Sequence, residues 1–189
     1  MGVTTFLWAG WFVLSLIFGG RCEQPELVQN FVSKKYLGRW YEIYREKSVP
    51  FEQEDCATAT YRELDGNFIE VNNIEYNIAE SKWAAENPTK PADAQCSAFR
   101  SGHCQVKFVW VQPWSDYKIL YTDYTTHSVV YGCDTFVGGM VKFDWLWALT
   151  RVPNAIGSAA HTALTNTVFA VINSKLEDFG DVNTRLRPT

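Results

Sequence analysis

The sequence contains little histidine, no marked excess of either charge and no long apolar segment. An apolar run from Phe6 to Phe18 is shorter than the roughly 20 residues that a membrane-spanning helix needs. The net charge of -4 gives no basic surface that would attract nucleic acid. The three histidines, His103, His127 and His161, lack the spacing of metal ligands. These absences argue against nucleic acid as a partner and against a metal site.

Sequence features that usually mark an enzyme are also missing. No Ser/His/Asp arrangement, glycine-rich phosphate loop or pair of carboxylates stands out. No internal repeat, low-complexity tract or linker divides the chain. The missing motifs predict that the protein has no catalytic activity. Its 189 residues, of which 47% are hydrophobic, predict one globular domain with an ample core.

The first 20 residues carry no charged side chain, and small residues follow the apolar run. This pattern is typical of a signal peptide, with cleavage after Gly19, Gly20 or Cys22. An uncleaved membrane anchor is the alternative. We expect residues 1–20 to be removed, so that residues 21–189 form a secreted domain without an integral membrane segment.

After Tyr36 the chain alternates short apolar runs with turn residues such as Asp65-Gly66 and Gly138-Gly139. Regular spacing of this kind predicts an all-β barrel or sandwich. Eight strands are expected, over residues 36–47, 56–64, 67–77, 79–86, 104–111, 117–123, 127–134 and 142–151.

Beyond Pro153 the pattern changes, because apolar residues from Ile156 to Val168 recur at three- and four-residue intervals. That spacing predicts one amphipathic helix with Asn154 as its N-cap. Its apolar face is covered most simply by packing on the outside of the β-structure. The charged tail from Lys175 to Thr189 is expected to fray.

Three short motifs carry a resemblance to a known family. They are Gly38-Arg39-Trp40, Thr122-Asp123-Tyr124 and the late Arg151, which in this order and at these separations resemble the three signature regions of the lipocalins. The run from Lys35 to Ile43 is most similar to apolipoprotein D-like lipocalins and to the arthropod pigment-binding lipocalins. The resemblance implies an eight-stranded antiparallel up-and-down barrel with one C-terminal α-helix packed outside.

The same three motifs are expected to form the closed floor of that barrel. Neighbouring strands of a meander alternate in direction, so Trp40, Thr122-Asp123-Tyr124 and Arg151 arrive at one end. Gly38 lets the chain turn into the first strand without a Cβ clash. Arg151 can then lie over the Trp40 ring as a cation–π contact. These residues would be structural and carry no chemistry.

Alternation along the strands predicts which side chains face the lumen, because a one-residue slip inverts every face. Lys118 would meet a ligand carboxylate there, pair with Glu42, or reach solvent at the rim. A filled barrel core is the alternative to an open cup. The side chains expected to line the lumen and bind the ligand are Glu42, Tyr44, Ala59, Tyr61, Val106, Phe108, Trp110, Lys118, Leu120, Trp145 and Trp147.

The chain has five cysteines. The resemblance to apolipoprotein D-like lipocalins implies that Cys22 pairs with Cys133. Cys96 and Cys104 flank one loop at the closed end and are expected to pair with each other. Cys56 is then left as a thiol near the mouth, either free or with a disulfide partner outside the chain.

Together with the resemblance, these features predict a secreted carrier that holds one small hydrophobic ligand in the barrel lumen. Two alternatives remain open: a prostaglandin-synthase-like isomerase that uses Cys56, and an interaction protein with a filled barrel. Lipids, retinoids, bilins, carotenoids and steroids all suit an aromatic cup. No cofactor is expected apart from a non-covalently bound chromophore or lipid.

Overall fold

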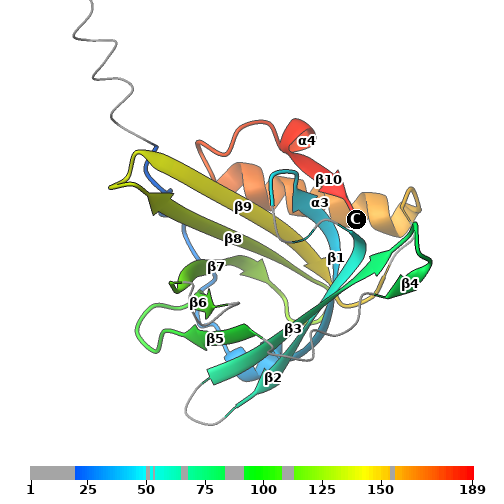
Figure 1. Cartoon of the computed structure of the whole chain (residues 1–189), viewed down its shortest axis with the longest axis horizontal. Helices are drawn as coiled ribbons and strands as arrows, with labels where there is room; N and C mark the ends of the chain where they lie inside the picture. Colours follow the sequence, from blue (N-terminus) through cyan, green and yellow to red (C-terminus); the bar gives the residue numbers. More distant parts are fainter. Residues whose placement is uncertain are drawn as a thin grey trace, which may run out of the picture.

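The computed structural model describes residues 20–49, 52, 54–64, 68–83, 92–107, 113–153 and 156–189. Eight antiparallel strands form a closed barrel, in which each strand pairs with its neighbour along the chain and the last pairs with the first (Figure 1). This confirms the expected fold. The barrel strands are β1 (Gly38–Glu46), β2 (Asp55–Glu63), β3 (Phe68–Asn77), β5 (Ala92–Cys96), β6 (His103–Lys107), β7 (Ser115–Thr122), β8 (His127–Phe136) and β9 (Val141–Thr150).

The fourth barrel strand differs from the one expected at residues 79–86. Within that range the structure has only β4 (Lys82–Trp83), a two-residue strand that pairs with the end of β3. The barrel position belongs to β5, which pairs with β3 and β6. The reason is burial: residues 78–83 are exposed, whereas Ala92 and Ala94 alternate with polar residues and face the core.

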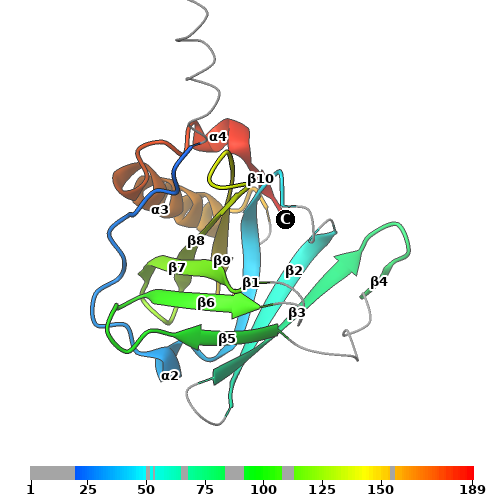
Figure 2. The same cartoon turned by 60° about the vertical axis from the view of Figure 1, so that its left-hand side comes forward.

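One long helix, α3 (Ala159–Lys175), packs outside the barrel against β7 and β8 (Figures 1 and 2). Val168 and Ile172 are buried on the apolar face of α3, so the expected helix is confirmed. The N-cap is Ser158, whose hydroxyl accepts a hydrogen bond from the His161 backbone N–H at 3.1 Å. Asn154, the expected cap, lies outside the described residues.

The C-terminal tail does not fray. It forms α4 (Val182–Arg185) and β10 (Leu186–Pro188), and β10 pairs with Tyr44 to Glu46 of β1. Beyond Tyr41, β1 no longer pairs with β2, so β10 occupies the side of β1 that β2 has left. The apolar residues that anchor the tail are buried; they are Leu176, Phe179, Val182 and Leu186.

The two expected disulfides are present, one between distant parts of the chain and one across a short loop. Cys22–Cys133 ties the N-terminal arm to β8, and Cys96–Cys104 links facing residues of β5 and β6. Cys56 is an exposed free thiol. A short helix, α2 (Ser33–Tyr36), leads from the arm into β1.

At the floor of the barrel, Arg151 joins the last strand to the first. Its guanidinium carbon lies 3.8 Å from the centre of the Trp40 ring. Its nitrogens donate to the carbonyls of Lys35, Tyr36, Leu37, Arg39 and Tyr124.

The backbone of the floor is adapted to this contact. Gly38 has a φ of +96°, and a Cβ there would lie 3.2 Å from Arg151 Nη1, so glycine suits both the conformation and the close approach. In the turn before β8, the Asp123 carboxylate accepts backbone N–H bonds from Thr125, Thr126 and His127.

Among the described residues, no helix is both long and apolar enough to span a bilayer. Residues 1–19, which contain nearly all of the expected signal peptide, lie outside the described part of the chain.

Candidate ligand site in the barrel lumen

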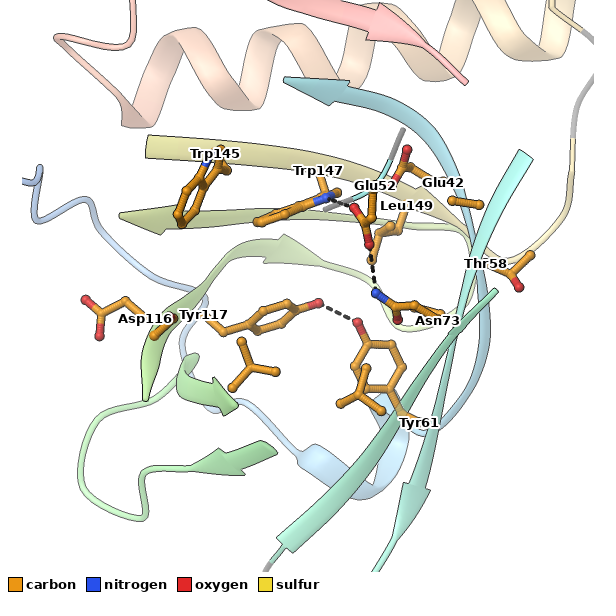
Figure 3. A pocket seen from close by; sticks show the side chains of 15 residues that line it. Glu42, Glu52, Thr58, Tyr61, Asn73, Asp116, Tyr117, Trp145, Trp147 and Leu149 are labelled. Carbon is orange, nitrogen blue, oxygen red and sulfur yellow. Dashed lines mark hydrogen bonds between the residues drawn. The ribbon is translucent and has the colours of Figure 1, made fainter. Parts of the chain in front are cut away.

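The lumen holds a small cavity of about 50 Å³, and Figure 3 shows the side chains that line it. One wall is aromatic, with Trp145 and Trp147 side by side on the inner face of β9. Another wall is made of small residues, Ala57 and Ala59 of β2. The described lining residues are Glu42, Glu52, Ala57, Thr58, Ala59, Tyr61, Val71, Asn73, Val106, Ser115, Asp116, Tyr117, Trp145, Trp147 and Leu149.

A glycine makes room for the two indole rings. Gly132 of β8 lies opposite Trp145 in the sheet register. A Cβ at this position would lie 3.4 Å from the Trp147 ring and 3.1 Å from the Asp116 carbonyl oxygen. A larger residue at Gly132 would therefore push against the aromatic wall of the cavity.

Below the cavity the barrel is filled by tyrosines and Trp40. The Tyr61 and Tyr117 hydroxyls share a hydrogen bond of 2.6 Å (Figure 3), and Tyr36 stacks on Trp40 with ring centres 4.9 Å apart. Burial raises the pKa of Tyr36 to about 12, and it also raises the pKa values of Tyr61 and Tyr117. These hydroxyls are therefore neutral donors and acceptors at physiological pH.

At the mouth, the Glu52 side chain reaches into the lumen from the connection between β1 and β2 (Figure 3). Its carboxylate accepts one hydrogen bond from Trp147 Nε1 and one from Asn73 Nδ2, each 2.8 Å long. These two bonds fix the carboxylate over the cavity. Burying this carboxylate is favourable only while both donors keep their charge-assisted hydrogen bonds to it.

Three carboxylates surround one buried guanidinium beside the cavity. Arg45 Nη1 lies 3.1 Å from Glu75, 3.3 Å from Glu42 and 3.6 Å from Glu52, and the arginine is 1% exposed. Burial raises the pKa of the Glu42 carboxyl well above its ordinary value. The neighbouring Glu52 raises this pKa further, while Arg45 lowers it.

The placement expected for Tyr44 was wrong. The pairing of β1 with β9 shifts by one residue between Glu42 and Tyr44, a β-bulge that turns Tyr44 outward. Its ring packs against Phe169 of α3 at 5.3 Å between centres, and its hydroxyl accepts a hydrogen bond from Thr165. Arg45 takes the inward position instead.

The placements expected for Lys118 and Leu120 were wrong for the same reason. A second bulge lies between Ile119 and Tyr121 of β7, so alternation counted back from Thr122 inverts along the rest of the strand. Leu120 packs in the outer core with α3. Lys118 is fully buried on the outer side, with Nζ 3.0 Å from Asp116 and 3.3 Å from the Glu23 carbonyl oxygen.

The remaining expected positions divide into two groups. Phe108 and Trp110 lie outside the described residues. The others line the cavity: Glu42, Ala59, Tyr61, Val106, Trp145 and Trp147.

Sequence reasoning missed several polar residues of the lumen, among them Arg45, Glu52, Asn73 and Tyr117. Asn73 and Tyr117 share a face with Val71 and Ile119, and that alternation was the signal that could have placed them.

The sequence that forms this barrel and its cavity is similar to that of known proteins. A family described as a lipocalin-like domain matches residues 32–170, which include all eight barrel strands. The chain belongs to the lipocalin family. It is 35% identical over 140 residues to apolipoprotein D of Bos taurus, covering 71% of this chain and 68% of that protein. It is 36% identical over 136 residues to apolipoprotein D of Mus musculus, with the same coverage.

Solved lipocalin structures from arthropods share the fold. Insecticyanin from the tobacco hornworm Manduca sexta matches with a TM-score of 0.64 at 19% identity, covering 91% of this chain and 87% of that chain. Lobster apocrustacyanin A1 matches with a TM-score of 0.60 at 18% identity, covering 82% and 77%. This lipocalin is therefore apolipoprotein D-like in sequence and similar to the arthropod proteins in fold.

In this lipocalin Cys56 does not line the lumen cavity. It lies in an outer groove of about 620 Å³, together with Tyr76, Trp83 and the C-terminal Pro188 and Thr189. The groove and the lumen cavity share Glu42 and Ala57, because β1 and β2 diverge there. Among the described residues, no group of three or more histidine, cysteine or acidic side chains is arranged to hold a metal ion.

Proposed function

We propose that this lipocalin is a secreted carrier that holds one small hydrophobic molecule in the barrel lumen. The observation that carries the proposal is the pair of indoles, Trp145 and Trp147, that line an apolar cavity together with the small residues Ala57 and Ala59. Large flat side chains beside small ones favour a flat or elongated apolar guest. Membership of the lipocalin family, whose members carry small hydrophobic ligands, supports the same function.

The cavity must enlarge to accept such a guest. A volume of about 50 Å³ holds one or two water molecules, whereas sites for small organic ligands usually measure roughly 300 to 1,000 Å³. At the mouth, hydrogen bonds from Asn73 and Trp147 and an ion pair with Arg45 hold the Glu52 carboxylate in place.

The small cavity also favours a second candidate, an interaction protein with a filled barrel. In that case the lumen is a packed core, and partners bind the outer surface. The isomerase alternative has less support, since Cys56 lies in the outer groove and not among the residues that line the lumen cavity.

Secretion is part of the proposal, with residues 1–20 as the signal peptide and residues 21–189 as the mature domain. The uncharged apolar leader supports it. Two disulfides, Cys22–Cys133 and Cys96–Cys104, suit an oxidising compartment.

The expected affinity for the ligand can be calculated from the apolar area that the ligand buries on binding. Burying about 400 Å² of ligand at about 25 cal/mol per Å² yields roughly 10 kcal/mol. Immobilisation removes at least about 4 kcal/mol before contacts with the wall are counted. The roughly 6 kcal/mol that remains corresponds to a dissociation constant of about 40 μM, and contacts with the aromatic wall are expected to bring it into the range between micromolar and nanomolar.

The test is to express the full-length chain in cells that secrete proteins and to purify it from the medium without organic solvent. Its absorption spectrum and the mass spectrum of a solvent extract should reveal one small apolar compound per chain. An extract without any such compound, together with no uptake of added retinol, would favour the filled barrel.

A further inference from the structure

Two buried acceptors at the lumen cavity make no hydrogen bond in the described part of the chain. Asn73 Oδ1 is one of them, and the other is Glu42 Oε1, which lies 3.3 Å from Arg45 Nη1 in an ion pair; both residues line the cavity. Glu42 is only 6% exposed. Because a buried acceptor without a donor is costly, these atoms point to a ligand group that brings hydrogen-bond donors.

The charge of the lining has one sign. Glu42, Glu52 and Asp116 carry carboxyl groups, and no lysine, arginine or histidine is present among the described residues that line the cavity. Arg45 lies next to this lining, but its guanidinium is shared between Glu42, Glu52 and Glu75 and donates to the Glu54 carbonyl. Asp116 already pairs with Lys118 and His103. Glu42 and Glu52 are therefore the carboxyl groups that meet a guest.

These two carboxyl groups are held in position before a ligand arrives. Trp147 and Asn73 fix Glu52 over the cavity from opposite sides (Figure 3). Glu42 is held by β1, at the residue before the bulge. Preorganised acceptors bind a cationic donor without a large loss of side-chain entropy.

An anionic ligand end meets the opposite situation. The lysine that was expected to receive a ligand carboxylate, Lys118, is buried on the outer side of β7. A fatty-acid carboxylate entering the lumen would therefore face Glu42 and Glu52 without an available cation among the described lining residues. Like charges in a desolvated site repel strongly.

We propose that the ligand is an apolar molecule with a protonated amine at one end, and that Glu42, Glu52 and Asn73 receive this amine. The apolar body then lies against Trp145 and Trp147. This inference rests on the proposed carrier function and specifies the chemical class of its ligand.

The experiment compares three ligands with the same twelve-carbon chain: dodecylamine, dodecan-1-ol and dodecanoate. Each displaces the neutral fluorophore N-phenyl-1-naphthylamine from the mature protein at pH 7, below its micellar concentration. Dodecylamine should bind at least tenfold more tightly than dodecan-1-ol, and dodecanoate should bind most weakly. Dodecan-1-ol or dodecanoate binding as tightly as dodecylamine would overturn the inference and leave the carrier function intact.

Substitutions of the carboxyl groups test which residues cause the preference for dodecylamine. Glu42→Gln and Glu52→Gln should each reduce the advantage of dodecylamine by fivefold or more, while the affinity for dodecan-1-ol changes less than twofold. Glu54→Gln is the matched control, because its carboxylate accepts from Asn77 and does not line the cavity. An equal loss in Glu54→Gln would contradict the assignment. Should neither the fluorophore nor any of the three ligands bind, the carrier function fails and the inference fails with it.

Discussion

The guanidinium of Arg151 lies over the indole of Trp40, with 3.8 Å between the guanidinium carbon and the ring centre. The two residues are far apart in sequence, yet they meet because β1 and β9 pair to close the barrel. Arg151 also donates to carbonyls on both sides of this seam, including those of Leu37 and Tyr124. The contact therefore stabilises the closed end of the barrel and lies below the lumen cavity.

Substitution of these floor residues should lower stability and leave ligand recognition in place. Trp40 is fully buried, so Trp40→Ala should reduce the free energy of unfolding by roughly 3 to 5 kcal/mol. Arg151→Ala should cost less, because Arg151 is partly exposed. Urea unfolding followed by circular dichroism measures both. A Trp40→Ala variant with wild-type stability that has lost its ligand would show that the floor assignment is wrong.

The Cys22–Cys133 disulfide should contribute strongly to stability. It closes a loop of 111 residues, and long loops gain most from a cross-link. The double variant Cys22→Ser, Cys133→Ser should lose roughly 2 to 5 kcal/mol in urea unfolding. Cys56→Ser is the control, since this thiol is free and exposed. The idea fails if the double variant unfolds at the same urea concentration as the control.

Glu42 should make stability depend on pH. Its pKa is raised in the folded protein by burial and by Glu52, so the folded state holds a proton that the unfolded state has released. Stability therefore falls as pH rises from the ordinary carboxyl pKa through the higher folded pKa. Glu42→Gln should be more stable than the wild type at pH 8, and the difference should shrink at pH 4. Urea midpoints at the two pH values decide, and a larger gain at pH 4 would contradict the sign.

Tyr44 tests the bulge in β1. Because its ring packs between the barrel and α3, Tyr44→Ala should destabilise the fold by roughly 2 to 4 kcal/mol without changing ligand affinity in the protein that remains folded. Thermal unfolding and a retinol titration measure the two effects. A wild-type melting temperature together with weakened retinol binding would show that Tyr44 lines the lumen after all.

The sequence was sufficient to predict the barrel, the helix and both disulfides, because alternation, turn residues and three family motifs report directly on them. Alternation failed at Tyr44 and Lys118 because a β-bulge adds one residue without leaving a clear sequence signal. In β1 the expected face holds up to the bulge, because Glu42 lines the cavity.

The polar residues of the site could not be predicted from the sequence either. Glu52 lies in a connection between strands, where periodicity gives no direction, and only the fold brings it to Trp147 across a separation of 95 residues. The docked tail was missed for a related reason. Its four apolar anchors recur at intervals of three and four residues, but they are spread among charged residues, and only the fold shows that they reach the outer surface beside β1 and α3.

The central claim is that the lumen, and not the outer groove, holds one apolar molecule per chain. The most direct measurement is a tryptophan-quenching titration with retinol on the wild type and two matched variants. Trp147→Ala removes a lumen wall, and Trp83→Ala removes a half-exposed indole that lines the outer groove. We predict saturation at one retinol per chain, with affinity at least about tenfold weaker in Trp147→Ala and unchanged in Trp83→Ala. Loss of binding in Trp83→Ala with wild-type affinity in Trp147→Ala, or no binding below about 10 μM in any of the three proteins, would contradict the account.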